Sequence, residues 1–445
     1  MRPGRTTLVL AATATALALL AASCGSGDDA ATGATSTSAP AGATTTTTTT
    51  TGDDLATPVA GTGVEDCFDA TTTIECPAEG EPFFLQDGQV QAGGPLTYTD
   101  NGDGTVTDER TGLVWQQEFS QVAWADAEAA AAAADTGGFD DWRVPTIDEL
   151  WSLIDLSGDQ GSADPSSAEA PADAVPFVDT DVFDFEYPDT SAGGRYIDAQ
   201  YLTGTEYVST TMQGDDSFFG VNFADGRIKA YPKTGNATSS VYYARFVRGG
   251  DGYGDSTFTD GGDGTVTDDA TGLVWMQVDS GDEQVADAVA ATSRADGTLD
   301  WQEALAFCAD LSYAGVDDWR LPDAKELQGL VDYSRSPDTT GSAAIDPVFA
   351  TTPITDEGGA DGFGAYWTST SFSPGLDAYI VNFGEALGLV GGEYVDAHGA
   401  GSVRTDPKQG EPQEGAGPQG DIRRVYDFAR CVRDDGAGGG APSPL

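Results

Sequence analysis

The chain repeats a long stretch of its own sequence. Y-T-D-N-G-D-G-T-V-T-D-E-R-T-G-L-V-W at 98–115 returns as F-T-D-G-G-D-G-T-V-T-D-D-A-T-G-L-V-W at 258–275. D-D-W-R-V-P-T-I-D-E-L at 140–150 returns as D-D-W-R-L-P-D-A-K-E-L at 317–327. A duplication of this length predicts two copies of one folding unit. We place a first module at 95–249 and a second module at 256–434.

The charge balance is strongly acidic. There are 20 Lys and Arg residues against 73 Asp and Glu residues, which gives a net charge of −53. Such a surface repels nucleic acids and anionic lipid headgroups, so we expect no nucleic-acid partner. Hydrophobic residues make up 39% of the chain, which is enough for a packed core in each module.

The N-terminus has the features of an export signal. Arg2 and Arg5 precede an apolar run, and the small residues after the run end on Cys24. This ending is similar to a bacterial lipobox. We therefore predict a lipoprotein signal peptide at 1–23 and a lipidated Cys24 that anchors an extracytoplasmic protein to the bacterial cell membrane or cell surface. An ordinary secretory signal with a chance cysteine is the alternative.

Three further segments lie outside the modules. Residues 24–61 are rich in Thr, Gly, Ser and Asp and are expected to form a disordered tether. The lead segment, 62–94, contains Cys67 and Cys76, which we expect to form a disulfide in an oxidising compartment. Residues 435–445 are expected to form a flexible tail.

Both modules predict the same order of elements, so the expected fold class is α+β. A hairpin with Asp-Gly turns comes first. A helix follows, at 124–134 or 301–311, and a second helix is expected to start at Pro145 or Pro322. The last third is expected to form short strands, at 206–211, 220–223 and 242–248 in the first module and at 365–371, 378–383 and 427–433 in the second.

Comparison of the modules predicts a second disulfide. Alignment of the first helices places Ala131 opposite Cys308, and alignment of the last strands places Phe246 opposite Cys431. The first module thus lacks both cysteines and the second has both. The simplest explanation is that Cys308 and Cys431 are bonded. Two independent buried thiols are the alternative.

These motifs resemble known families. The order of helices and strands, with a bridge from first helix to last strand, resembles the C-type lectin-like fold, and R-[V/L]-P-x-x-x-E resembles its sulfatase-modifying-factor branch. Both modules are most similar to the bacterial family named after the C-terminal domain of the Legionella collagen-like adhesin. The shared motifs are G-D-G-T-V-T-D-x-x-T-G-L-x-W, D-W-R-L-P-x-x-x-E-L, Y-W-x-S-T, V-N-F and R-C-V-R. In the first module Val144 replaces Leu, Val208 replaces Trp and Phe246 replaces Cys. The resemblance implies exported surface proteins that act in adhesion or ligand binding, without established catalysis.

Several repeated residues are interpreted as structural. An Arg next to Trp at a helix start favours a buried ion pair with the Glu that follows, since the planar guanidinium suits a carboxylate; an anion clamp is the alternative. The structural residues in this interpretation are Trp115, Trp142, Arg143, Glu149, Trp275, Trp319, Arg320 and Glu326.

Six repeated aspartates are candidate calcium ligands. Oxygen ligands among glycines suit calcium, but the spacing does not match an EF-hand. The favoured interpretation is that these carboxylates form hairpin turns. They are Asp100, Asp103, Asp108, Asp260, Asp263 and Asp268. We predict no other cofactor.

The sequence favours ligand binding over catalysis. His398 is the single histidine, so no Ser–His–Asp arrangement can occur in both modules. We expect a non-catalytic protein that binds a glycan or a surface protein, with Trp367, Arg423 and Arg424 as candidate ligand contacts. The alternatives are a structural envelope lipoprotein and an enzyme on a sulfatase-modifying-factor-like scaffold.

Overall fold

The computed structural model describes residues 59–235, 239–250, 252–290 and 292–434. The predicted signal peptide, Cys24, most of the tether and the tail at 435–445 lie outside the described residues. No helix within the described part of the chain is long and apolar enough to cross a membrane.

The structure is mixed α/β, with many strands, few short helices and two similar halves. The lead segment forms β1 (Cys67–Phe68), β2 (Thr73–Ile74) and α1 (Asp87–Val90). The first module forms β3 (Tyr98–Asp100), β4 (Thr105–Asp108), β5 (Val114–Gln116), β6 (Ser120–Val122), α2 (Ala127–Ala132), α3 (Ile147–Ser152), β7 (Gln200–Thr211), β8 (Asp215–Asn222), β9 (Arg227–Pro232), β10 (Tyr242–Ala244) and β11 (Val247–Arg248).

The second module repeats this plan with added elements. It forms β12 (Phe258–Asp260), β13 (Thr265–Asp268), β14 (Leu273–Met276), α4 (Ala286–Val289), α5 (Trp301–Ala309), α6 (Ala324–Gln328), α7 (Pro337–Thr340), β15 (Pro353–Thr355), β16 (Asp361–Phe363), β17 (Ala365–Phe372), β18 (Asp377–Asn382), β19 (Leu387–Val390), β20 (Glu393–Asp396), β21 (Val403–Pro407), β22 (Gln413–Ala416), β23 (Asp421–Arg423) and β24 (Val432–Asp434).

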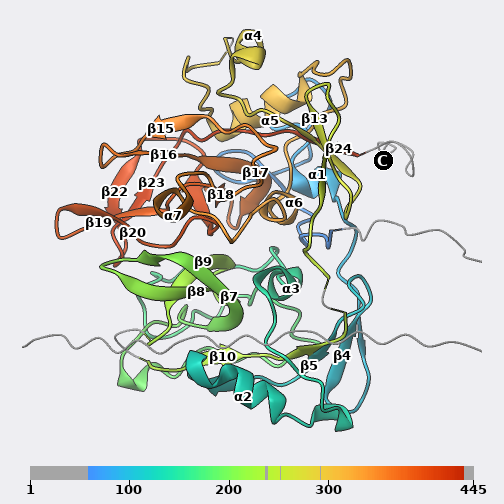
Figure 1. The fold of residues 1–445 in the computed structure, drawn as a ribbon, viewed down its shortest axis with the longest axis vertical. Helices are drawn as coiled ribbons and strands as arrows, with labels where there is room; N and C mark the ends of the chain where they lie inside the picture. The colour runs from blue at the N-terminus through green and yellow to red at the C-terminus, as the bar shows by residue number, and fades with distance from the viewer. Residues whose placement is uncertain (1–58, 236–238, 251, 291, 435–445) are drawn as a thin grey trace, which may run out of the picture. The chain divides into compact units, whose positions relative to one another are not determined.

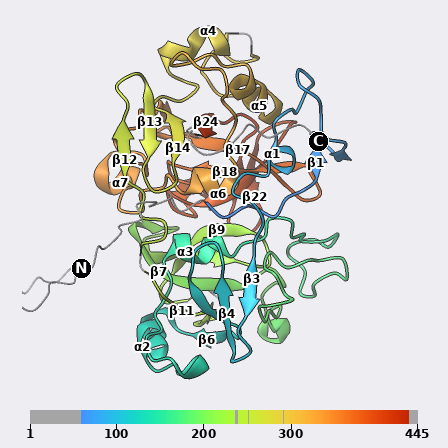
Figure 2. The same cartoon turned by 90° about the vertical axis from the view of Figure 1, so that its right-hand side faces the viewer.

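Each module contains a small antiparallel sheet that its last strand closes. The orders are β11-β5-β4-β3 in the first module and β12-β13-β14-β24 in the second (Figure 2). The predicted hairpins are therefore confirmed in both modules. The final strand of the second module is shorter than predicted, because Asp427 makes only an isolated bridge with Leu299 and the ladder begins at Val432.

One larger sheet joins the two modules. Its eight strands run β17-β18-β21-β9-β8-β7-β10-β6, so that β21 of the second module lies beside β9 of the first. In Figure 1 the labelled strands β17 and β18 of this sheet lie in the upper half, and β9, β8, β7 and β10 lie in the lower half. Ile228 pairs with Val403 across this junction. Within each module the same residues pair with a V-N-F strand, Ile228 with Val221 and Val403 with Val381. Ile228 and Val403 therefore occupy equivalent positions, and the pairing is close to a two-fold symmetric one.

The second helix of each module starts two residues later than predicted. Thr146 and Asp323 are the N-cap residues of α3 and α6, and each closes a capping box with the Glu three residues on. Pro145 and Pro322 precede the cap instead of starting the helix. The carbonyl of Pro322 is then available to accept a hydrogen bond from the Ser369 backbone, at 2.7 Å.

The structure also corrects the alignment of one strand. By sequence, Tyr207 and Val208 align with Tyr366 and Trp367, but in the structure Thr203 is the residue that matches Thr368. Each of these threonine carbonyls accepts a bond from the indole of its module's first helical Trp, Trp124 at 3.1 Å and Trp301 at 2.8 Å. The residue equivalent to Trp367 is therefore Leu202, which is fully buried, whereas Val208 is 39% exposed.

The tryptophans of the repeated motifs are all buried. Trp115 and Trp275 belong to a core cluster that contains residues of both modules, including Ile228 and Val403. Trp142 lies in a cluster of the first module, and Trp319 lies in a cluster of the second. The shared cluster means that the modules bury apolar surface against each other as well as within themselves.

Both predicted disulfides are present in the structure. Cys67 and Cys76 close the small loop of the lead segment, and Cys308 on α5 is bonded to Cys431 before β24. In the first module Ala131 and Phe246 lie in one apolar cluster, so aromatic packing takes the place of the bond.

The two disulfides should differ in their contribution to stability. They span 9 and 123 positions of sequence. In the chain-entropy model, removing the Cys308–Cys431 bond lowers the free energy of unfolding by about 5 kcal/mol and removing the Cys67–Cys76 bond by about 2.5 kcal/mol. Denaturant unfolding of Cys308→Ala/Cys431→Ala and Cys67→Ala/Cys76→Ala tests this order. Equal losses would contradict it.

The contact between α3 and α6 should make stability depend on pH. Burial raises the pKa of Asp148 to about 7, although a hydrogen bond from Gln328 opposes the shift. Between about pH 4 and pH 7 the folded protein therefore holds a proton that the unfolded chain releases, so the free energy of unfolding falls as pH rises through this range.

Asp148→Asn should remove this part of the pH dependence and should be more stable than the wild type at pH 7.5. Thermal unfolding from pH 4.5 to 7.5 measures the effect. Asp287→Asn makes the same charge change on exposed α4 and serves as the matched control. Parallel pH profiles for the wild type and Asp148→Asn would rule out this assignment.

Candidate functional site

The junction of the two modules places basic side chains on one face of the sheet. Arg227 and Lys229 flank Ile228 on β9, and Arg404 follows Val403 on β21. Side chains alternate between the faces of a strand. Because Ile228 and Val403 point into the shared core, the three cations point to the opposite face. Lys229 and Arg404 are equivalent positions of the two modules.

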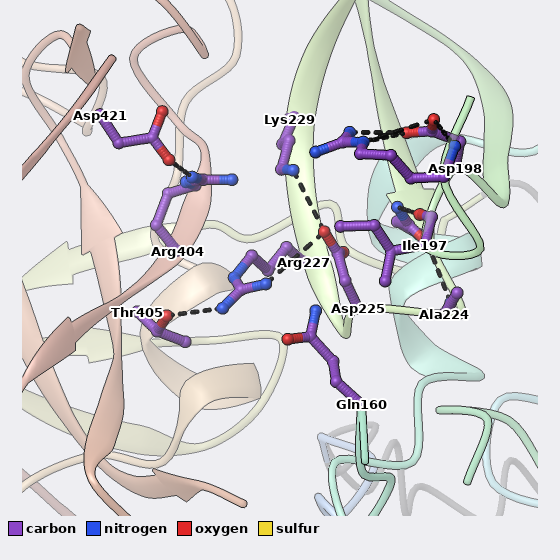
Figure 3. A network of polar contacts seen from close by, with 12 residues as sticks. Gln160, Ile197, Asp198, Ala224, Asp225, Arg227, Lys229, Arg404, Thr405 and Asp421 are labelled. Carbon is purple, nitrogen blue, oxygen red and sulfur yellow. Dashed lines mark hydrogen bonds and ion pairs between the residues drawn. The ribbon is translucent and has the colours of Figure 1, made fainter. Parts of the chain in front are cut away.

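Two carboxylates offset these cations. Asp225, in the turn before β9, lies 3.1 Å from Lys229 Nζ and 3.6 Å from Arg227 Nη1. Asp421 on β23 pairs with Arg404 through one oxygen and contacts His398 Nε2 through the other, at 2.8 Å. Figure 3 shows the Arg227–Asp225 group on the first module and the Arg404–Asp421 pair on the second, facing each other across the junction.

The turn that carries Asp225 is held in place by its own residues. The Asn222 side chain donates to the carbonyl of Ile197 at 2.7 Å and accepts from the backbone of Ala224 at 2.9 Å. Gly226 has φ +66°, and a Cβ there would lie 2.6 Å from both Phe177 and the Tyr379 hydroxyl. Only glycine fits this turn without displacing its neighbours.

The electrostatics of the cluster reflect burial and an excess of positive charge. Burial lowers the pKa of Lys229 to about 8, with Arg404 and Arg227 adding to the shift against the opposing effect of Asp225. Burial favours the neutral form of Asp225, but the neighbouring cations outweigh it and its pKa is lowered. Burial, together with Arg404, lowers the pKa of His398 to about 4, so this imidazole is neutral at pH 7.

These side chains line a pocket of about 270 Å³ between the modules. We call it the junction pocket. Its lining holds six of the chain's 20 basic residues and only four acidic ones, Asp225, Asp377, Asp406 and Asp421, which is a local exception in a protein of net charge −53. The basic residues are Arg195, Arg227, Lys229, Arg404, Arg423 and Arg424. Apolar side chains such as Ile197, Ile380 and Leu387 complete the wall.

Several buried polar atoms of the pocket residues have no hydrogen-bond partner among the described residues. The donors are Arg404 Nη1, Arg227 Nε and Gln160 Nε2, the acceptors are Asp225 Oδ1 and Asp406 Oδ2, and His398 Nδ1 also lacks a partner. A buried donor or acceptor without a partner costs about 1–3 kcal/mol. The pocket is therefore better suited to a polar ligand than to an apolar one.

Two of the three predicted ligand contacts line the junction pocket. Arg423 pairs with Asp377, and Arg424 makes a two-pronged pair with Glu357 at 2.8 Å. Trp367 is fully buried and donates to the Leu299 carbonyl at 2.7 Å. The structure thus places Trp367 in the core of the second module and away from the pocket.

The six candidate calcium aspartates act as acceptors within turns. Asp103 Oδ1 accepts from the backbone and hydroxyl of Thr105, and Asp263 does the same for Thr265. The other four bond to neighbouring backbone N–H or hydroxyl groups: Asp100, Asp108, Asp260 and Asp268. In the part of the chain that the structure describes, no three His, Cys, Asp or Glu residues form a group that could hold a metal ion.

The Arg–Glu pairs of the repeated motif are structural. Arg143 contacts Glu149 and Arg320 contacts Glu326, each with an Nη1–Oε2 distance of 2.6 Å. Each Glu also closes its capping box. Because both Glu side chains are buried and already bonded, these pairs fix the start of a helix.

Sequence reasoning missed the centre of the site. Arg227, Lys229 and Arg404 lie in ordinary strand sequences, R-I-K and V-R-T, with no motif around them. The signal that could have found them is the low number of basic residues, since two basic residues that alternate along a strand are unusual in so acidic a chain. This signal does not show that β9 and β21 are neighbours.

Comparison with known proteins identifies the modules. The model of the Lcl C-terminal domain family matches residues 104–248 and 264–404, which is more than half of the chain. No curated protein and no solved structure matches. The two disulfides indicate an extracytoplasmic protein, and with the two matched domains they relate it to adhesins. The chain belongs to the Lcl C-terminal domain family and contains two tandem copies of that domain.

Proposed function

We propose that this is a non-catalytic ligand-binding or adhesion protein of the bacterial cell surface, anchored through lipid on Cys24. Its two modules, which we interpret as C-type lectin-like, act as one binding unit with a glycan or a surface protein as partner. The observation that carries the proposal is the junction pocket, because residues of both modules line it and leave polar atoms without partners. Calcium is not required in this proposal.

The chemistry of the pocket favours binding over catalysis. Its histidine, His398, is 2% exposed and bonded to Asp421, so it is not placed to exchange protons with a substrate. The four cysteines among the described residues are all in disulfides, which leaves no thiol there for an oxidation of the sulfatase-modifying-factor type. A purely structural envelope role gives no reason for unpartnered polar groups at a pocket.

A ligand screen tests the binding function. The mature protein should retain a ligand on an array of glycans and surface proteins, with or without calcium. Ala416→Trp puts a large side chain into the junction pocket and should abolish retention, whereas Ala129→Trp on exposed α2 should not. Retention that Ala416→Trp leaves unchanged, or no retention of any ligand, would contradict the proposal.

Lipid anchoring predicts where a Cys24→Ala variant accumulates. The wild type should fractionate with membranes and carry a lipid on its N-terminal peptide, since stable anchoring depends on the acyl chains. Cys24→Ala should lack the lipid and appear in the soluble exported fraction with both disulfides formed. Mass spectrometry of the N-terminal peptide and fractionation measure this. Identical partitioning of the two proteins would refute the anchor.

A further inference from the structure

We propose that the junction pocket binds a small, hydroxyl-bearing monoanion, of the class of sugar acids. This inference rests on the proposed binding function and specifies the ligand. The first argument is charge. At the centre of the pocket three cations, Arg227, Lys229 and Arg404, face two carboxylates, Asp225 and Asp421. One positive charge remains, and a single negative charge balances it.

The second argument is the direction of the donors. Arg404 pairs with Asp421 through Nη2, and its Nη1 has no partner. Arg227 bonds to the Thr405 hydroxyl at 2.8 Å and keeps Nε without a partner. In Figure 3 one guanidinium nitrogen of Arg404 points across the junction toward Lys229. An oxoanion between the strands would accept from both modules, and charge-assisted bonds of this kind are the stronger ones.

The third argument concerns the rest of the ligand. Asp225 Oδ1 and Gln160 Nε2 are an acceptor and a donor without partners, and Figure 3 shows the Gln160 amide below the Asp225–Arg227 pair. A hydroxyl group can both donate and accept, so it satisfies either atom. Both residues are at least nine-tenths buried, which makes their unpartnered atoms costly without a ligand.

The volume of the pocket and the net charge of the protein restrict the ligand further. At about 270 Å³ the pocket lies just below the range of about 300–1,000 Å³ that is usual for drug-sized ligands, so it suits one sugar-sized unit. A long polyanion would meet the repulsion of a protein with net charge −53. The anion is therefore either a free sugar acid or the terminal unit of an acidic saccharide.

Isothermal titration of the mature protein with glucuronate tests the proposal. Glucuronamide and glucose are neutral probes of nearly the same shape and should bind at least about tenfold more weakly, because they cannot form charge-assisted bonds with the two guanidinium groups. An oligosaccharide that ends in glucuronate distinguishes the two sources: tighter binding than free glucuronate indicates a saccharide terminus, and weaker binding indicates the free acid.

Three variants and a control locate the site. Arg404→Gln and Arg227→Gln should each weaken glucuronate binding at least about tenfold. Arg294→Gln removes the same charge from a surface pair with Asp296 and should bind as the wild type does. Arg404→Lys keeps the charge without the planar fork and should fall between the wild type and Arg404→Gln. Unchanged melting temperatures show that the variants are folded.

Raising the pH supplies an independent measurement. The pKa of Lys229 is about 8 in the pocket, so its charge is lost above that pH and the affinity for glucuronate should fall between pH 7 and pH 9.5. A bound anion favours the protonated amine, which gives the sign of the effect. The charged groups that act on Lys229 come from the turn before β9, from β9, from β21 and from β23: Asp225, Arg227, Arg404 and Asp421.

Three results would overturn the inference. The first is equal affinity for glucuronate and glucuronamide. The second is an affinity for glucuronate that Arg404→Gln leaves unchanged, and the third is no binding of glucuronate or glucuronamide. A neutral ligand that binds the wild type and is lost in Ala416→Trp would overturn the monoanion class while leaving the proposed binding function in place. The two proposals therefore fail on different results.

Discussion

The antiparallel pairing of β9 with β21 determines most of what is distinctive in this protein. It extends two half-sheets into one and packs Ile228 and Val403 into a core that both modules share. The same pairing brings Lys229 and Arg404 together on the other face, because side chains alternate along a strand. These like charges are tolerated because Asp225 pairs with Lys229 and Asp421 pairs with Arg404. The pocket is thus a consequence of how the modules join.

Features within one module could be predicted from the sequence, because each occurs in both modules or is replaced by other residues at the equivalent positions of one module. The hairpins follow from Asp-Gly turns, and the loss of both partners at Ala131 and Phe246 indicates the Cys308–Cys431 bond. The start of the second helix was misplaced because proline suits a first helical turn in general. Here Thr146 and Asp323 cap the helix instead, and their side-chain bonds to Glu149 and Glu326 decide the boundary.

The contact between modules could not be predicted, for a physical reason. The last strand of a module has the same alternation of polar and apolar residues whether its edge pairs with another strand or faces solvent. The sequence R-I-K therefore does not show that β9 pairs with β21. The misalignment of Tyr207 has a related cause. Strand β7 is long and its register against β8 shifts twice, so a Tyr near its end resembles Tyr366 by sequence, whereas Tyr201 takes that place in the fold. Arg423 and Arg424 were found because clustered arginines are conspicuous in an acidic chain.

Duplication followed by divergence explains why the pocket needs both halves. Lys229 and Arg404 are equivalent residues, yet the position equivalent to Arg227 is Ser402, and Asp421 and His398 come from segments that the first module lacks. Two identical modules would place two identical cations beside the two-fold axis between β9 and β21. They would have no counterpart of Asp421 or His398 next to these cations. Two added segments break that symmetry: the insertion between β18 and β21 carries His398, and the segment after β21 carries β23 with Asp421. In the second module Asp421 neutralises Arg404, whereas in the first module Arg227 and Lys229 exceed Asp225 by one positive charge, so neither module forms the site alone.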